Sequence, residues 1–379
     1  MIYMDHHATT PVDPRVVEAM LPWFTEGFGN PSSRTHKYGW TAAEAVNRAR
    51  SAVARLVGVS AREVVFTSGA TEADNLAVKG VAAAAAPARD HLVTVATEHH
   101  AVLDPCHRLE RAGWRVTRIG VGPDGLVDPA AIEAALTDRT ALVSVMAASN
   151  EIGVLQPLAD IVARAHARGV PVHTDAAQAA GHVAFDAAAL DVDLVSITAH
   201  KMYGPKGVGA LVVRRRTPRL ALEPMLDGGG QEGGLRSGTL NVPGIVGFGR
   251  AAEIRAAELA SEGTRLGALR DRLLAGLRAG LEGVRVNGSL EARLPHNLHV
   301  SFEGVEGEAL LMALGDIAVS TGAACSSGSA APSHVVAALG VDAALARASL
   351  RFGLGRSNTE AEVDQVVERV VTVVRRLRG

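Results

Sequence analysis

Short apolar runs alternate with amphipathic, alanine-rich stretches between about residues 60 and 215. The runs are rich in valine, isoleucine and leucine, and they predict buried strands at residues 64–67, 92–97, 116–119, 141–145, 170–174, 194–198 and 209–213. Stretches between them have helical periodicity, as at residues 72–86, 101–112 and 158–168. This alternation predicts an α/β fold with a large, mainly parallel, seven-stranded sheet covered by helices. The last two runs are too close together for a helical crossover, so one strand is expected to be antiparallel.

The composition changes after Pro243. Residues 250–283 are rich in alanine, arginine, glutamate and leucine, and they predict a long helix that leads into a second domain. Residues 290–379 predict a smaller α+β unit, with a strand near 298–302 and a final amphipathic helix at 359–377. We therefore expect a large domain at residues 15–255 and a small domain at residues 1–14 plus 256–379, which carries a loop at about 320–331.

Composition excludes several classes of protein. With 379 residues, 47% of them hydrophobic and 21% charged, the chain is long enough for two domains and too apolar to be disordered. A net charge of −2 provides no strongly basic field, which argues against direct nucleic-acid binding. The two cysteines, Cys106 and Cys325, cannot build a disulfide framework or a four-thiolate metal site.

Two features bear on location. Residues 1–7 lack the basic region and apolar core of a signal peptide. The longest uniform apolar stretch, residues 81–86, is far shorter than the ~20 residues that cross a bilayer. The sequence therefore predicts a soluble, cytoplasmic protein that does not associate with a membrane.

Polar side chains follow several of the predicted strands. The small-residue turn 68–72 opens a helix, and its free backbone N–H groups suit a phosphate. His99 follows the second strand, Asp175 and Gln178 follow the fifth, and Lys201 follows the sixth. Each feature alone is more often structural, but ligands of open α/β sheets bind at these strand ends. Together the residues supply what pyridoxal phosphate (PLP) needs: an amine, a carboxylate for the ring nitrogen, a stacking group and phosphate donors.

Among the lysines, Lys201 is the favoured PLP ligand because it directly follows a strand and can be held rigidly. Lys206 lies in a turn, and Lys37 and Lys79 lie away from strand ends.

The two cysteines lie in different surroundings. Residues 320–331 are nearly all small, so the Cys325 thiol is expected to be accessible and mobile, as suits a nucleophile that travels. The alternative is an incidental cysteine in a linker. Cys106, on an amphipathic stretch, is expected to lie in the core.

Taken in order, these segments resemble the cysteine desulfurases of the NifS/IscS type, within the class V aminotransferase family of fold-type I PLP enzymes. The matching motifs run almost from end to end and comprise residues 3–5, 8–10, 29–33, 67–72, 97–99, 150–153, 173–178, 200–201, 204–207, 229–232, 236–239, the loop around Cys325 and residues 350–352. The chain departs from the family pattern at His6-His7, Ser149, Thr198 and Gly233-Gly234, and none of these departures removes a catalytic group.

The resemblance implies how PLP is held in the large domain. Lys201 would carry it as a Schiff base and move protons, and Asp175 would pair with the pyridinium nitrogen. Gln178 would donate to the phenolic oxygen, and His99 would stack on the ring and serve as an acid or base. The phosphate would be held by Ala70, Thr71, Thr198 and His200, with Thr239 reaching it from a second subunit, which implies a homodimer.

The resemblance also implies the reaction. Asn150 and Arg351 would bind the substrate carboxylate, and Asn150 also belongs to the cofactor site. Cys325 would attack the sulfur of L-cysteine, leaving a persulfide on the enzyme and releasing L-alanine. Sulfur would pass to acceptor proteins such as an iron–sulfur scaffold or a tRNA-thiolation enzyme. No resident metal is implied, although Cys325 could transiently ligate an iron–sulfur cluster during transfer.

Three alternatives remain at this point. One is another class V PLP enzyme, such as a selenocysteine lyase or an aminotransferase. The second is a metal-dependent phosphoesterase, prompted by residues 5–7 and by His99-His100. The third is a non-enzymatic sulfur carrier.

Overall fold

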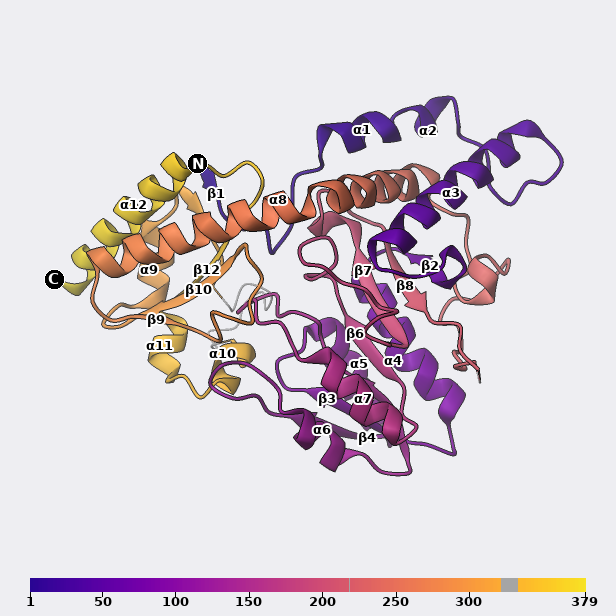
Figure 1. Cartoon of the computed structure of the whole chain (residues 1–379), viewed down its shortest axis with the longest axis horizontal. Helices are drawn as coiled ribbons and strands as arrows, with labels where there is room; N and C mark the ends of the chain where they lie inside the picture. The colour runs from indigo at the N-terminus through magenta and orange to yellow at the C-terminus, as the bar shows by residue number, and fades with distance from the viewer. Residues whose placement is uncertain (218, 322–332) are drawn as a thin grey trace.

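The computed structural model describes residues 1–217, 219–321 and 333–379. Its centre is a seven-stranded sheet in the order β2-β8-β7-β6-β5-β3-β4 (Figure 1). The strands are β2 (Val64–Thr67), β3 (His91–Val95), β4 (Arg115–Ile119), β5 (Thr140–Ser144), β6 (Val172–Asp175), β7 (Leu194–Thr198) and β8 (Gly209–Val213). All seven predicted strands are present, with ends shifted by up to two residues. β8 is antiparallel to both β2 and β7, which confirms the predicted antiparallel strand.

Helices cover both faces of this sheet. Successive side chains of a strand point to opposite faces, and since all residues of a strand such as β2 are apolar or buried, both faces must be covered. On β2, Val64 and Phe66 join a core with α3 (Lys37–Leu56), α7 (Leu158–Ala167) and the first part of α8 (Val242–Gly280). Val65 joins a second core with α4 (Ala70–Ala85) and α5 (His100–Arg111), which contains Cys106. The prediction that Cys106 is a core residue is confirmed.

The long helix α8 (Val242–Gly280) has 39 residues and crosses the molecule (Figure 1). It begins earlier than the predicted start at residue 250, because Pro243 occupies its first turn and the Asn241 side chain accepts a hydrogen bond from Gly244 N. α8 packs on α1 (Pro14–Met20) and α3 near the large sheet and on α12 (Glu360–Arg378) farther along. Sequence periodicity did not predict α1, α2 (Pro22–Thr25) or α3.

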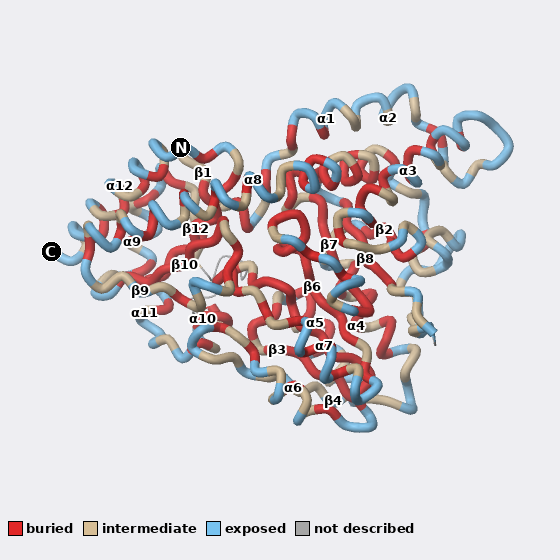
Figure 2. Tube along the Cα trace, in the orientation of Figure 1, coloured by how far each residue is buried: buried red, intermediate tan, exposed pale blue. Residues whose placement is uncertain are grey.

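A second unit surrounds the antiparallel sheet β12-β10-β9. It consists of β9 (Val284–Val286), β10 (Asn297–Phe302), β12 (Ser349–Gly353), α9 (Gly307–Ala313), α10 (His334–Ala338), α11 (Ala343–Arg347) and α12, with a small parallel pair formed by β1 (Ile2–Tyr3) and β11 (Ile317–Ala318). Its apolar residues form a core separate from those of the large sheet, as the buried regions of Figure 2 show.

The remaining described elements are short. They are α6 (Pro129–Ala135) and the 3-10 helices η1 (Ala61–Glu63), η2 (Ala199–Lys201) and η3 (Glu232–Gly234). Within the described part of the chain, every helix is too short or too polar to cross a membrane.

Candidate active site

A cavity of about 660 Å³ lies where the carboxyl ends of the parallel strands meet the second unit. Its walls come from the turn after β2, the segments at or after the ends of β3, β5, β6 and β7, the N-terminal residues Asp5, His7, Ala8 and Thr9, and Ser320 and Arg351 of the second unit. Ten of the predicted site residues line it: Ala70, Thr71, His99, Asn150, Asp175, Gln178, Thr198, His200, Lys201 and Arg351. The fold thus gathers in one place residues that are up to 281 positions apart, from Ala70 to Arg351.

The two lysines of the cavity differ in how they are held. Lys201 ends η2, directly after β7, and its Nζ donates to the backbone carbonyls of His7 and Ala8, the latter over 2.8 Å. Lys206 also lines the cavity but is exposed. A side chain fixed at a strand end can present its amine in one orientation, so Lys201 is the better-placed amine.

Burial shifts the pKa values of Asp175 and His99 in opposite directions. Asp175 was predicted to follow its strand, but it is the last residue of β6. Burial raises the pKa of its carboxyl group. Burial lowers the pKa of His99, against the attraction of Asp175. His99 also caps α5, because its Nδ1 accepts a hydrogen bond from Ala101 N at 3.1 Å. The ring is therefore neutral, with its proton on Nε2.

Two further buried acids, which the sequence did not reveal, lie close to Asp175. Burial raises the pKa of Asp74 and of Glu98 well above the usual values, and the charge of Asp175 adds to this effect. Glu98 Oε1 accepts a hydrogen bond from Met146 N at 2.5 Å, and Asp74 Oδ1 lies 3.5 Å from His173 Nε2. Since charged forms are costly to bury, this environment favours the neutral form of both acids.

The N-terminus of α4 suits an anion. Its N-cap, Gly69, provides no side-chain hydrogen bond, and the carboxylate of Glu72, which also lines the cavity, is neutralised by Arg236 and accepts a hydrogen bond from Ser68 N, each at 2.8 Å. The first residues of this 16-residue helix, Ala70 and Thr71, line the cavity, so the positive end of the helix dipole lies beside it. Thr198 and His200 contribute further polar groups to the same cavity, and burial lowers the pKa of His200 to about 4.

Arg351 supplies a buried positive charge at the opposite wall. It is 4% exposed and donates to Asp5 Oδ1 at 2.7 Å and to the Asn150 carbonyl at 2.8 Å. Its Nε has no hydrogen-bond partner. These two bonds use two of the five N–H donors of the guanidinium, and a guanidinium with donors to spare beside a cavity can bind a carboxylate.

Two predicted residues do not join the cavity. Thr239 is exposed and is not part of the wall. Cys325 lies outside the described residues. Both flanks of residues 322–332, however, end beside the site: Ser320 pairs with the Arg351 backbone, and the Ser333 hydroxyl donates to Glu151.

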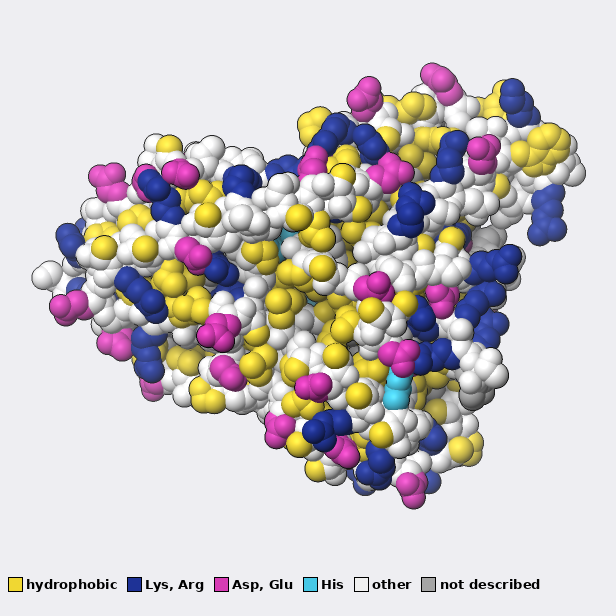
Figure 3. All heavy atoms as spheres, in the orientation of Figure 1, with side chains coloured by type: hydrophobic (Ala, Val, Ile, Leu, Met, Phe, Trp, Pro, Cys, Tyr) yellow, Lys and Arg dark blue, Asp and Glu magenta, His cyan; other side chains and the backbone are white. Residues whose placement is uncertain are grey.

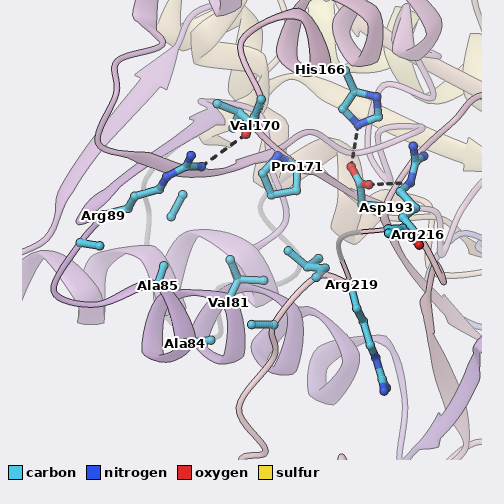
Figure 4. Close-up of a pocket in the computed structure, with 16 residues that line it drawn as sticks. Val81, Ala84, Ala85, Arg89, His166, Val170, Pro171, Asp193, Arg216 and Arg219 are labelled. Carbon is cyan, nitrogen blue, oxygen red and sulfur yellow. Dashed lines mark hydrogen bonds and ion pairs between the residues drawn. The ribbon is translucent and has the colours of Figure 1, made fainter.

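A second cavity of about 700 Å³ lies at the opposite side of the sheet from the first, near the amino ends of β5, β6 and β7 (Figure 4). Its charged groups largely pair with one another: His166 Nε2 lies 2.8 Å and Arg216 Nε 2.9 Å from the Asp193 carboxylate. Among its described lining residues there is no lysine and no acid free of a cation, so it lacks the groups that the first cavity offers.

The loop around Gly233-Gly234 is anchored through its neighbour Glu232. That carboxylate binds the Arg50 guanidinium in two hydrogen bonds of 2.6 Å and accepts Phe66 N at 2.7 Å. Both glycines have positive φ, 67° and 86°, which a glycine adopts without strain. The departure from the family pattern therefore gives a tight turn that is fixed to β2.

An amine, a buried carboxyl group, an uncapped helix N-terminus and a buried arginine in one cavity fit PLP and an amino-acid substrate. The fold and this site define a fold-type I PLP-dependent enzyme. A model of the aminotransferase class-V family matches residues 2–366, and the chain belongs to this family, whose members are PLP-dependent.

Within this family, the chain is similar to proteins named as cysteine desulfurases and NifS-like proteins. The chain is 59% identical over 377 residues to a protein named cysteine desulfurase IscS from Anaeromyxobacter sp. (strain Fw109-5), with 100% of this chain and 93% of the relative covered. A solved NifS-like protein superposes with a TM-score of 0.92 at 38% identity, over 99% of this chain and 100% of that one. The solved structure of SspA in complex with cysteine has a TM-score of 0.84 at 36% identity, over 93% and 99%.

Proposed function

We propose that the protein is a cysteine desulfurase, which converts L-cysteine to L-alanine and hands the sulfur to an acceptor. The observation that carries this proposal is the convergence of Lys201, Asp175, His99 and Arg351 on one cavity. The relative named cysteine desulfurase, at 59% identity, and the structural neighbour solved with cysteine support the choice of substrate.

The residues of the large unit would hold PLP. Lys201 would bind it covalently, Asp175 would hold a proton on the ring nitrogen, and Gln178 would bind the phenolic oxygen. The α4 N-terminus, with Thr198 and His200, would hold the phosphate. When bound, PLP serves as an electron sink for the charge that develops at the substrate.

The other groups would bind the substrate and move protons. Arg351, next to Asn150, would bind the carboxylate of L-cysteine. Lys201 Nζ, held near the carbonyls of His7 and Ala8, would move a proton at the substrate Cα. The neutral His99 imidazole would accept and return a proton beside the ring.

Cys325 would take the sulfur. Its thiolate attacks the sulfur of L-cysteine, an S–S bond forms, the substrate C–S bond breaks, and protonation of the remaining carbon leaves L-alanine. The enzyme keeps a Cys325 persulfide. Two equivalents of a thiol reductant then release hydrogen sulfide and form one disulfide, or an acceptor protein takes the sulfur instead. The position of Ser320 and Ser333 beside the cavity supports a reach from this loop to the substrate.

We also propose that the enzyme is a homodimer. Five large apolar side chains between residues 21 and 40 are exposed: Leu21 59%, Phe24 61%, Phe28 65%, Tyr38 57% and Trp40 58%. Hydrophobic atoms are visible at the surface of this region, around α2 and the start of α3 (Figure 3). A patch of this kind suits a protein interface, and Thr239 would then reach the phosphate of the partner's site.

The acceptors are proposed to be proteins, such as an iron–sulfur scaffold or a tRNA-thiolation enzyme. A cytoplasmic location is proposed as well, since the reaction needs Cys325 as a free thiol, and reducing compartments keep thiols free.

The reaction tests the function directly. Purified protein with PLP, L-cysteine and a thiol reductant should release alanine and sulfide in equal, catalytic amounts. Cys325→Ser should keep PLP bound and stop both products. Alanine release that persists in Cys325→Ser would indicate another class V PLP enzyme, such as a lyase, and the absence of both products with PLP bound would exclude L-cysteine as the substrate.

A further inference from the structure

A buried chain of hydrogen bonds leads from the second unit to the cavity. It runs from Arg293 through Asn297 and His7 to Gln178, and all four side chains are buried. Arg293 precedes β10 and Asn297 is its first residue, whereas His7 and Gln178 line the cavity. His7 was not among the predicted site residues.

The direction of this chain is fixed at its start. Arg293 Nη1 lies 2.8 Å from one side-chain atom of Asn297, and a guanidinium only donates, so that atom is Oδ1. The other atom lies 3.0 Å from the Glu151 backbone carbonyl, which only accepts, so it is Nδ2. Burial lowers the pKa of Arg293 to about 9, which leaves it protonated at neutral pH. Two independent partners thus give the same Asn297 orientation.

The orientation of Asn297 decides the protonation of His7. Asn297 Nδ2 lies 3.1 Å from His7 Nε2. Since Nδ2 is a donor, His7 Nε2 accepts and carries no proton. A neutral imidazole then has its proton on Nδ1.

The protonation of His7 in turn decides the orientation of Gln178. His7 Nδ1 lies 2.9 Å from one side-chain atom of Gln178, which is therefore the acceptor Oε1. The other atom lies 3.0 Å from the His7 backbone carbonyl and is therefore Nε2. His7 thus binds both ends of the Gln178 amide, with its ring on the oxygen and its carbonyl on the nitrogen.

Stacking holds the His7 ring in this plane. The ring centroids of His7 and His296 are 4.4 Å apart at 23°, and those of His296 and His182 are 4.2 Å apart at 22°. His182 Nε2 donates to the Lys201 carbonyl at 2.7 Å, so the stack is also tied to the lysine. Burial, and then the charge of Arg351, keep the pKa of His7 well below its usual value, in agreement with the neutral ring.

We propose that His7 is a positioning residue: as a neutral imidazole protonated on Nδ1, it occupies Gln178 Oε1 and makes Gln178 present an N–H donor to the cavity. The consequence for PLP rests on the proposed function, because a donor at this position stabilises the anionic phenolic oxygen of the cofactor. The orientation of the chain itself depends only on the protein.

The tautomer can be measured on the protein without cofactor. Long-range ¹H–¹⁵N correlation of histidine-labelled protein, with the His7 signals assigned by their loss in His7→Asn, should give a protonated Nδ1 and an unprotonated Nε2 at neutral pH. A protonated Nε2, alone or together with Nδ1, would overturn the proposal. This measurement stands even if the protein binds no PLP, in which case only the proposed function fails.

Three variants then test positioning against simple packing. His7→Asn keeps an N–H near the Nδ1 position and should bind PLP within about twofold of the native protein. His7→Leu removes it and should weaken PLP binding about tenfold. It should also raise the pH midpoint of the bound cofactor's visible absorption, because the anionic oxygen loses a donor.

The neighbouring His6 provides a control, because its ring binds Gly353 O at 2.9 Å and does not line the cavity. His6→Leu should leave the midpoint unchanged. An unchanged midpoint in His7→Leu, or equal effects of Asn and Leu, would contradict the proposal.

Discussion

Arg351 on β12 donates a hydrogen bond of 2.7 Å to Asp5, and this contact joins the second unit to the N-terminal segment at the cavity wall. The carboxylate of Asp5 fixes one end of the guanidinium, and the Asn150 carbonyl fixes the other. The arginine is thereby held rigidly, and these two contacts use only two of its five N–H donors. Such a group is prepared for a substrate carboxylate without having to move.

Replacing the guanidinium by a single ammonium tests this. Arg351→Lys should raise the KM for L-cysteine at least about tenfold, because lysine cannot hold two acceptors and bind a carboxylate in a fixed plane. The change in kcat should be much smaller. Steady-state kinetics measure both. Arg356→Lys, which replaces a nearby arginine that is not part of the cavity wall, serves as the control. An unchanged KM in Arg351→Lys would remove Arg351 from the substrate site.

The buried ion pair between Arg50 and Glu232 should hold the glycine loop. Arg50→Met leaves the Glu232 carboxylate, 2% exposed, without its cation and should lower the free energy of unfolding by about 3 kcal/mol. Arg48→Met, on the same helix, breaks a pair in which both side chains are 68% exposed and should cost at most about 0.5 kcal/mol. Urea denaturation measures both. Equal losses would show that the buried pair is no stronger than the exposed one.

Stability should fall in mild acid. Ten histidines have lowered pKa values, among them His173, His182 and His299, whose burial lowers the pKa to about 3. Between those values and the usual 6.5, the unfolded chain binds more protons than the folded one, so the free energy of unfolding falls as the pH falls. Four buried acids with raised pKa values, Asp74, Glu98, Glu151 and Asp175, act in the opposite direction but are fewer.

A single substitution isolates one of these histidines. His299→Gln should flatten the slope of stability against pH by about 0.7 kcal/mol per pH unit at pH 6.5, rising to about 1.4 kcal/mol per pH unit near pH 5, because one group no longer takes up a proton on unfolding. Denaturation at several pH values measures the slope. The exposed His107→Gln is the matched control. A slope that stays the same in His299→Gln would show that His299 does not resist protonation in the folded protein.

The exposed aromatic segment should form the dimer contact. The double substitution Phe24→Glu and Phe28→Glu should give a folded monomer in sedimentation experiments, since buried charges disrupt an apolar interface. Met312→Glu, at an apolar side chain on α9 that is 78% exposed, should remain a dimer. A native protein that sediments as a monomer would refute the dimer, and a double variant that remains dimeric would move the interface elsewhere.

Local patterns in the sequence were sufficient to predict the strands of the large sheet. The runs 64–67 and 194–198 match β2 and β7 residue for residue, because buried strands are continuous apolar runs. Asp175 was expected to follow its strand and instead ends it, since an inward carboxylate interrupts the apolar run without ending the hydrogen-bond ladder. α3 was missed because its buried face consists mainly of alanine and glycine, which give little contrast with its polar face.

The supporting contacts of the site depend on long-range packing and could not be predicted in this way. His7 binds Gln178 and Asn297, which are 171 and 290 positions away. Asp74 lies in a helical stretch where an acid is usually solvated, and only the assembled fold buries it beside Asp175. The roles of Thr239 and Cys325, and the domain boundaries at residues 14/15 and 255/256, stay predictions.

The central claim is that this cavity holds PLP on Lys201, although Lys206 lines the same wall. Reduction of the PLP-loaded protein with borohydride, followed by peptide mass spectrometry, reads out the attached lysine. We expect one modified residue, Lys201, with no attachment in Lys201→Ala and full attachment in Lys206→Ala. Attachment at Lys206, or equal attachment after loss of Lys201, would contradict it.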